Sequence, residues 1–476
     1  MYTLTKLRIV WTNACLKYII GRGYPFPRVS LDSLSIQSLE RHTCHSDQLA
    51  KKWLSCRWNP LRTWSTATTA NTSVTDARLL PGSQGTLLFT LSKSVWSVVT
   101  LWQLEPVISR TPGTACTFDK RCEWSPRGAI FNGFALNSSL ESEVKIAISI
   151  LNNGKQTVEL LSLKQDSHEW SLEPLLSVPT TFRPITLEGD ILAMSDDFRE
   201  TIIFNWRTRA YATLEHAQET AGISQYDHCI QVVFASHSIL VVRARSLHLF
   251  PMSTLKMQEE GPLRYSPIAR HSFGWVDSVS VQMTGSPEAF SSSSSSNVQQ
   301  PLSILVRAET DDPWSSDILS MELYTLNPNP EHDASPSPEA SDPHMTSSSP
   351  SPNSSPYIFP PVLTSRVSSR RGALRCRDII LGRRGTALWV QPRDRSVAGL
   401  YWTTDDNPLP VGPHTIVRSD YKHESAGGKE DAEEPEPEGK IIRWNEQHNW
   451  SSIDYDEDVG RIVLGTSFGS ITILDM

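Results

Sequence analysis

The sequence predicts a mainly β protein: a divergent β-propeller of six to eight blades, preceded by a short α-helical region. From about residue 72 onward, apolar and polar residues alternate with a period of two, as over residues 144–150, which is typical of half-buried antiparallel strands. Units of several such strands recur at intervals of about 40–50 residues once insertions are set aside, a period typical of propeller blades. The 476-residue chain is long enough for one propeller with additional segments.

Residues 1–70 form the predicted helical region. Apolar residues at helical spacing predict one helix over about residues 3–20 and another over about residues 33–54, and Pro60 ends the pattern. Lys6, Arg8 and Lys17 interrupt the first apolar run, so we interpret it as an amphipathic helix rather than a signal peptide. No run of about 18 apolar residues occurs in the chain, so no membrane-spanning helix is predicted.

Residues 71–476 form the predicted propeller domain. Asn153 and Gly154 separate two alternating runs and predict a hairpin, because both residue types accept a positive φ. Similar groups of strands are predicted within residues 77–104, 189–206, 230–250, 378–390 and 451–474. Three polar or Ser/Pro-rich ranges contain few apolar groups to offset the entropy of ordering, and they are predicted to be disordered insertions: about 284–300, 326–362 and 421–440.

Charge and cysteine content exclude several classes of function. The net charge is −8, and residues 1–70 hold ten Lys/Arg against three Asp/Glu, so the rest of the chain carries −15. Such an acidic body argues against a nucleic-acid-binding protein. The seven cysteines are odd in number and include no Cys-x-x-Cys pair, which favours reduced thiols in the cytoplasm or nucleus.

No catalytic, cofactor-binding or metal-binding site is predicted. Residues 465–469 match the Gly-x-Ser-x-Gly nucleophile elbow, but a strand is predicted after Ser467 and no acid followed by a histidine remains downstream, so we interpret the motif as a turn. His42, Cys44, His45 and Cys56 lack the paired spacing of structural zinc sites, and we interpret them as part of a helix surface.

A cluster of arginines near the C-terminal third is the densest candidate for partner binding. Nine arginines fall between residues 366 and 395, and the partner-binding candidates among them are Arg383, Arg384, Arg393 and Arg395. Guanidinium groups bind carboxylates and phosphates in a fixed fork geometry, so an acidic or phosphorylated protein is one interpretation. The other is that these are surface arginines paired with the acidic body of the chain.

Three stretches of the chain, residues 77–104, 379–395 and 452–475, resemble a family of basidiomycete F-box proteins with a C-terminal propeller-like repeat. Residues 77–89 with 101–104 resemble its first blade, and residues 379–395, with Gln391-Pro-Arg-Asp-Arg395, a penultimate blade. Residues 452–475 resemble its closing blade, and residues 49–58 its helical lead-in. The resemblance covers most of residues 20–476. An F-box opens with a Leu-Pro helix, whereas this chain begins with a segment that resembles its last helix, so an N-terminally truncated F-box is expected.

The resemblance implies a protein-binding adaptor, the substrate receptor of a Skp–cullin–F-box ubiquitin ligase, with no enzymatic activity of its own. Its expected partners are an Skp-type adaptor and an unknown target protein, with no nucleic acid and no membrane. An exposed apolar helix face, with Leu4, Leu7 and Trp11, is the candidate adaptor-binding surface. The alternatives are a stand-alone propeller scaffold without ubiquitin-ligase association and a propeller lectin or hydrolase.

Overall fold

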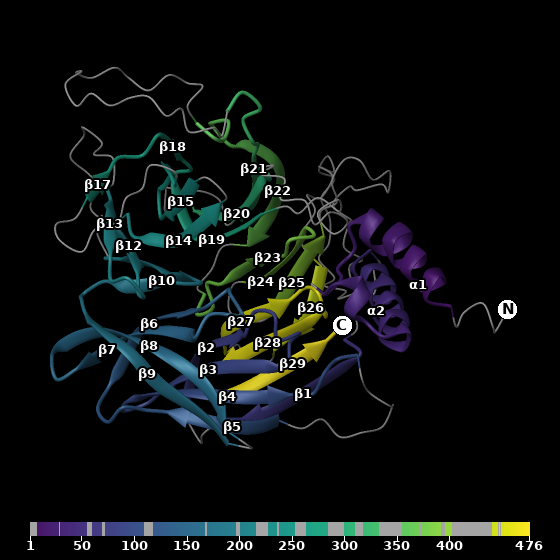
Figure 1. The fold of residues 1–476 in the computed structure, drawn as a ribbon, viewed down its shortest axis with the longest axis horizontal. Coiled ribbons are helices and arrows are strands. Elements are labelled where there is room, and N and C mark those ends of the chain that lie inside the picture. The colour runs from purple at the N-terminus through teal and green to yellow at the C-terminus, as the bar shows by residue number, and fades with distance from the viewer. Residues whose placement is uncertain are drawn as a thin grey trace, which may run out of the picture.

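The computed structural model contains a helical unit and a seven-bladed β-propeller (Figure 1). It describes residues 7–27, 29–54, 60–68, 72–108, 118–166, 169–196, 200–215, 227–235, 238–252, 263–283, 299–309, 318–332, 355–370, 374–391, 396–401, 440–445, 447 and 449–476. The predicted fold class is confirmed, and the blade number, expected to be six to eight, is seven.

Each blade is an antiparallel sheet whose strands follow one another from the central axis outward. The innermost strands are β2 (Ser73–Leu79), β6 (Ile130–Leu136), β10 (Arg183–Glu188), β14 (Cys229–Ala235), β19 (Trp275–Met283), β23 (Ile379–Leu381) and β27 (Trp450–Asp456). The second strands are β3 (Leu87–Lys93), β7 (Val144–Asn152), β11 (Ile191–Ser195), β15 (Ser238–Arg243), β20 (Leu302–Glu309), β24 (Thr386–Val390) and β28 (Arg461–Thr466).

The third and fourth strands form the outer half of each blade, and blade 3 has one further strand. The third strands are β4 (Ser97–Leu104), β8 (Lys155–Asp166), β12 (Thr201–Asn205), β16 (Ser246–Pro251), β21 (Ile318–Leu326), β25 (Ser396–Tyr401) and β29 (Ser470–Asp475). The outermost strands are β5 (Phe118–Trp124), β9 (Glu169–Pro179), β13 (Tyr211–Leu214), β18 (Ala269–Ser272), β22 (Val362–Arg370), β26 (Lys440–Trp444) and β1 (Arg62–Ala67). In blade 3, β17 (Leu263–Tyr265) adds a parallel strand outside β13.

The seventh blade joins the two ends of the propeller. Its three inner strands come from the C-terminus, and its outermost strand is β1, which pairs with β29 in the register Arg62↔Asp475 to Ala67↔Ser470. The sequence analysis placed residues 62–67 in the helical region. This boundary was missed because β1 has only half-buried and exposed side chains, so it lacks an apolar run. The propeller is therefore closed by hydrogen bonds between the first and last strands.

Two faces of the propeller are distinguished by strand direction. We call the face where the innermost strands begin the entry face and the opposite one the exit face. The pairs Ser73↔Lys93 and Trp450↔Thr466 place the turn between the second and third strands on the entry face. The turn between the first and second strands lies on the exit face.

The helical unit packs beside blades 6 and 7 (Figure 1). It consists of α1 (Arg8–Ala14), the π-helical turn η2 (Cys15–Ile19), the 3₁₀ turns η3 (Ile20–Arg22) and η4 (Leu31–Ser33), and α2 (Ile36–Leu54). The observed α2 starts three residues later than predicted. The first predicted helix is observed from Arg8, and residues 1–6 lie outside the described residues. No helix among the described residues is long and apolar enough to cross a membrane.

The predicted insertions largely fall outside the described residues, but the ends of one of them are folded. Residues 284–298, 333–354 and 421–439 are not described. Within the predicted insertion 326–362, Pro328 forms a β-bridge with Tyr357, and the Tyr357 ring is buried against blades 4 and 5. The Ser/Pro-rich composition of this range gave no sign of the contact, because Tyr357 is far in the sequence from the residues of blades 4 and 5 on which it packs.

Candidate functional site

The α1–η2 segment exposes an unusual number of large apolar side chains. Leu7 is 48% exposed and Ile9 is 63% exposed, and Val10, Leu16 and Tyr18 are also exposed. Five large apolar side chains are thus exposed within twelve residues, and exposed apolar surface is a feature of interaction sites. We call these five residues the helical apolar surface.

The opposite side of this segment holds it on the rest of the helical unit. Cys15, Ile19 and Ile20 pack in a small core with Leu39 and Ala50 of α2. Two hydrogen bonds from the Arg8 guanidinium fix the start of α1: Nη1 donates to the Leu34 carbonyl at 2.7 Å and Nη2 to the Leu31 carbonyl at 2.5 Å. The helical apolar surface is therefore displayed on a packed unit.

The three predicted adaptor-binding residues differ in their surroundings in the structure. Leu7 is exposed, as expected for a binding residue. Trp11 is partly buried and packs on the core of the helical unit, so its ring supports the helix. Leu4 lies outside the described residues. The sequence analysis did not select Ile9, Val10, Leu16 or Tyr18 as candidates, because burial of one stripe by α2 could not be inferred from the spacing of one helix.

The second helix attaches the helical unit to the propeller. Leu49 and Trp53 of α2 belong to the apolar core shared by blades 6 and 7, and the Trp53 ring lies 5.8 Å from that of Tyr455. His45 Nε2 donates to the Val459 carbonyl at 3.0 Å, and burial lowers the pKa of His45. A Cβ on Gly460 would lie 2.6 Å from Leu49 Cδ1, so glycine is required where the helix meets the exit face.

The residues considered as zinc ligands in the sequence analysis have other roles or positions in the helical unit. His42 packs edge-on against the Phe26 ring, His45 is bound to Val459, and the Cys44 side chain is exposed. Cys56 lies outside the described residues. Among the described residues, no cluster of His, Cys, Asp and Glu has the geometry of a metal site.

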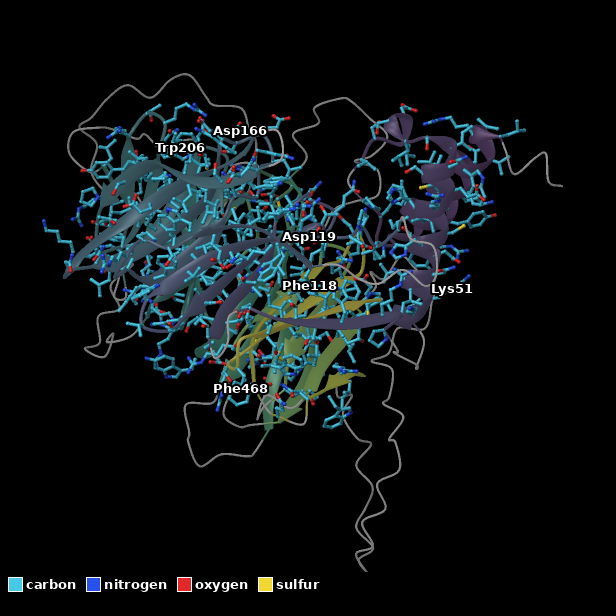
Figure 2. The ribbon with its side chains drawn as sticks, turned by 90° about the horizontal axis from the view of Figure 1, so that it is seen from below. Lys51, Phe118, Asp119, Asp166, Trp206 and Phe468 are labelled. Carbon is cyan, nitrogen blue, oxygen red and sulfur yellow. The ribbon has the colours of Figure 1, made fainter. Side chains whose placement is uncertain are left out.

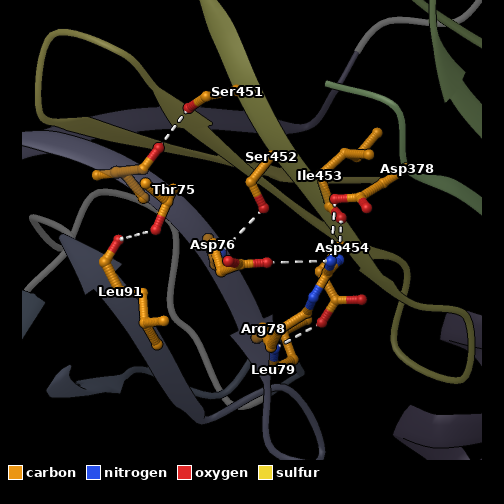
Figure 3. Close-up of polar contacts among 12 residues, drawn as sticks. Thr75, Asp76, Arg78, Leu79, Leu91, Asp378, Ser451, Ser452, Ile453 and Asp454 are labelled. Atoms are coloured by element: carbon orange, nitrogen blue, oxygen red, sulfur yellow. Dashed lines mark hydrogen bonds and ion pairs between the residues drawn. The ribbon is translucent and has the colours of Figure 1, made fainter. Parts of the chain in front are cut away.

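A second group of polar side chains lies where blades 1, 6 and 7 meet at the central axis (Figure 3). Arg78 on β2 donates to the Ile453 carbonyl of β27 at 2.8 Å and to Asp378 Oδ2, just before β23, at 3.0 Å. Asp454 Oδ2 accepts the backbone N–H of Leu79 at 2.6 Å, and Asp76 Oδ1 lies 3.4 Å from Arg78 Nη2. One guanidinium thus links three blades.

Burial and crowding shift the ionisation of this group. Burial raises the pKa of Asp76 to about 6, against the opposing effect of Arg78. Burial also raises the pKa of Asp454, which Arg78 partly offsets. The three surrounding carboxylates outweigh the desolvation of Arg78 and raise its pKa, so it remains protonated. The Arg78 charge therefore helps to hold blades 1, 6 and 7 together at the axis.

A related ion pair joins blade 5 to blade 6. Arg307 on β20 is fully buried, and its Nη1 lies 3.3 Å from Asp277 Oδ2 and 3.4 Å from the Arg377 carbonyl oxygen. Arg377 Nε lies 3.6 Å from Asp277 Oδ1. The sequence analysis missed this group and the Arg78 group. The available signal was a charged residue inside an otherwise apolar inner strand, since such residues are seldom buried without a partner.

The described arginines of the predicted cluster do not form one patch. Arg366 pairs with Glu322 on blade 5, and Arg375 donates to Ser467 Oγ at 3.0 Å on the entry face. Arg383 and Arg384 lie in the turn between β23 and β24 on the exit face, whereas Arg393 and Arg395 lie outside the described residues. The spacing in the sequence could not reveal that strand β23 separates these arginines onto opposite faces.

The exit-face turn is occupied by a carboxylate of the chain itself. Glu457 Oε2 accepts the backbone N–H of Arg384 at 3.0 Å, and Oε1 accepts that of Thr386 at 3.3 Å and the Thr386 hydroxyl. A Cβ on Gly382 would collide with the Glu457 carboxylate. Burial raises the pKa of Glu188 in blade 3, and the charge of Arg383 partly offsets this rise. This turn therefore joins blades 6 and 7.

The Gly465–Gly469 motif is a turn, as interpreted from the sequence. β28 ends at Thr466 and β29 begins at Ser470, and the Ser467 backbone N–H donates to the Asn449 carbonyl at 2.9 Å. The exposed Phe468 side chain lies at the tip of this turn, at the edge of the molecule (Figure 2).

Comparison with known proteins adds no family to this picture. No protein-family model matches the chain, and no curated protein matches it.

Proposed function

We propose that the protein acts by binding other proteins, with the helical unit as one binding surface and the propeller as another. A closed propeller is a scaffold whose loops are available for recognition at its faces, because its strands bury their apolar sides between blades. The helical apolar surface is the observation that carries the proposal, since it is exposed on a unit packed against the propeller. Binding rather than catalysis is the proposed activity.

The finer proposal is an adaptor role like that of an F-box substrate receptor. In this arrangement the helical apolar surface binds an Skp-type adaptor and the propeller presents the target. The resemblance of residues 77–104, 379–395 and 452–475 to F-box propeller proteins supports it, as does the exposure of Leu7. We propose the cytoplasm or nucleus as its compartment, which the five free cysteines of the described residues support: Cys15, Cys44, Cys122, Cys229 and Cys376.

Capture of a purified Skp-type adaptor by the immobilised full chain tests this proposal. We expect the wild-type chain to retain the adaptor and the double variant Leu7→Asp, Ile9→Asp to lose it, because carboxylates cannot enter an apolar interface without a partner. The matched control is Leu175→Asp, at another exposed leucine, on β9 in blade 2. Loss in the control as well, or no capture by the wild type, contradicts the adaptor role and leaves a stand-alone scaffold.

A further inference from the structure

The exposed large aromatic side chains of the propeller gather on three consecutive blades. Among the described residues of the propeller they are Trp96, Trp444 and Phe468, with exposed fractions of 45%, 57% and 64%. Trp96 belongs to blade 1, Trp444 to blade 6 and Phe468 to blade 7. We call these three residues the aromatic arc.

Strand register places all three members of the arc on the entry face. Trp96 lies in the turn between β3 and β4, next to the Lys93↔Ser97 pair. Phe468 lies in the equivalent turn of blade 7. Trp444 pairs with Ser396, the first residue of β25, which is the entry-face end of that strand. Large aromatic side chains are typical anchors of protein interfaces, because their apolar area becomes buried only when a partner binds.

An exposed cation accompanies each member of the arc. Lys93 precedes the turn that carries Trp96, and Arg443 precedes Trp444. The Arg375 guanidinium donates to Ser467 Oγ, directly beside Phe468. The exposed acid near this end of blade 1, Glu123, is already paired with Lys120 at 2.7 Å. A partner that fits this surface therefore carries carboxylates beside apolar side chains.

The overall charge of the chain favours a peptide segment over a lipid surface. Residues 71–476 carry a net charge of −15, and the carboxylates of the axial group lie partly buried around Arg78. An anionic bilayer that covered the entry face would face this acidic body, whereas a peptide segment contacts only the arc and the cations beside it.

We propose that the aromatic arc binds an extended segment of a target protein, rich in apolar residues and in Asp or Glu. This inference deepens the proposed function by locating the target-binding surface and stating the chemistry of the target, and it rests on the binding role but not on the adaptor. The arc supplies anchors for apolar side chains, and Lys93, Arg375 and Arg443 supply the opposite charge.

Selection of a random peptide library on the immobilised full chain tests the inference. We expect the selected peptides to combine apolar residues with Asp or Glu. A fluorescein-labelled peptide from the selection should bind the triple variant Trp96→Ser, Trp444→Ser, Phe468→Ser at least about tenfold more weakly than the wild type. It should bind the matched control Leu175→Ser as tightly as the wild type, and its affinity should fall as salt is added.

Three outcomes overturn the inference. The first is that no peptide is enriched, and the second is that the enriched peptides are basic or bind the triple variant as well as the wild type. The third is that phosphatidylserine vesicles sediment the wild type but not the triple variant, which assigns the arc to a membrane. Because Leu7→Asp with Ile9→Asp leaves the arc intact, peptide binding by that variant separates failure of this inference from failure of the adaptor role.

Discussion

Asp76 shares one guanidinium with Asp378 and Asp454, and this excess of acid over base determines how the axial group responds to pH. Burial raises the pKa of Asp76 to about 6, above the ordinary value of 3.8 that applies in the unfolded chain. Between about pH 4 and pH 6 the folded state therefore holds a proton that the unfolded chain has released. The contribution of Asp76 to the free energy of unfolding falls as the pH rises through this window. Water at its one-third exposed side chain moderates the effect.

The variant Asp76→Asn should remove this pH dependence, because an amide does not titrate. We expect the stability of the variant relative to the wild type to increase between about pH 4.5 and pH 7. Urea unfolding at several pH values measures the difference, and subtracting the wild-type curve cancels the contributions of the other acids. A difference that stays constant, or decreases with pH, would contradict a raised pKa of Asp76 in the folded protein.

At the scale of single elements, the sequence predicts the inner strands of the blades far better than the outer ones. Residues 77–104 contain the core of β2, β3 and β4, and residues 451–474 contain that of β27, β28 and β29. Such strands are buried on both sides and read as apolar runs. The outer strand β5 alternates half-buried and exposed residues and contains Asp119, Lys120 and Arg121, so its pattern resembles a loop.

The attachment of α2 is the element-scale feature on which the proposed function depends. Leu49 is buried between α2 and the exit face, against Gly460 and in the core that contains Trp53. The sequence predicts α2 within a few residues, but its docking site could not be predicted. The contact requires a glycine more than 400 positions away in the chain.

The variant Leu49→Ala should loosen the helical unit from the propeller. Removing a buried leucine side chain leaves a cavity and costs about 2–5 kcal/mol. We expect faster amide hydrogen exchange in α2 and little change in blades 2–4, whose apolar cores contain no α2 residue among those described. The conservative variant Leu49→Met should remain close to the wild type, because it keeps the side-chain volume. Equal exchange in α2 of the wild type and the Leu49→Ala variant would contradict the docking described here.

At the scale of the whole molecule, the ring is held where its first and last strands meet. Arg461 Nε lies 2.7 Å from Asp475 Oδ1, and Nη2 lies 3.0 Å from Oδ2, with both side chains buried. Arg461 Nη1 also donates to the Gly85 carbonyl of blade 1 at 2.6 Å, and the guanidinium lies over the Trp64 ring of β1. One side chain therefore contacts both strands that close blade 7 and the neighbouring blade.

Replacing Asp475 with Asn should destabilise the whole propeller. The change leaves the Arg461 charge buried without its counter-charge, which costs about 3–5 kcal/mol. Urea unfolding followed by circular dichroism measures the loss. The control is Asp119→Asn, which breaks an exposed ion pair with Arg121 on β5 (Figure 2) and should leave the unfolding midpoint close to that of the wild type. Equal midpoints for the two variants would exclude a closing role for Arg461.

The candidate surfaces were only partly predictable from the sequence. Leu7 was found because helical spacing marks an apolar face. The aromatic arc was not found, since Trp96, Trp444 and Phe468 share one face of consecutive blades only when the last blade lies beside the first. For the arginine cluster, the sequence suggested one shared surface that the fold does not form. Residues close in the sequence, such as Arg375 and Arg383, lie on opposite faces of one blade.

Amide hydrogen exchange of the full chain, with and without a purified Skp-type adaptor, tests the central claim most directly. The account predicts that the adaptor protects the α1–η2 segment, which carries Leu7, Ile9 and Val10, and leaves the entry face of blades 6, 7 and 1 unchanged. Protection confined to the propeller, or none at saturating adaptor, would contradict a binding role for the helical apolar surface.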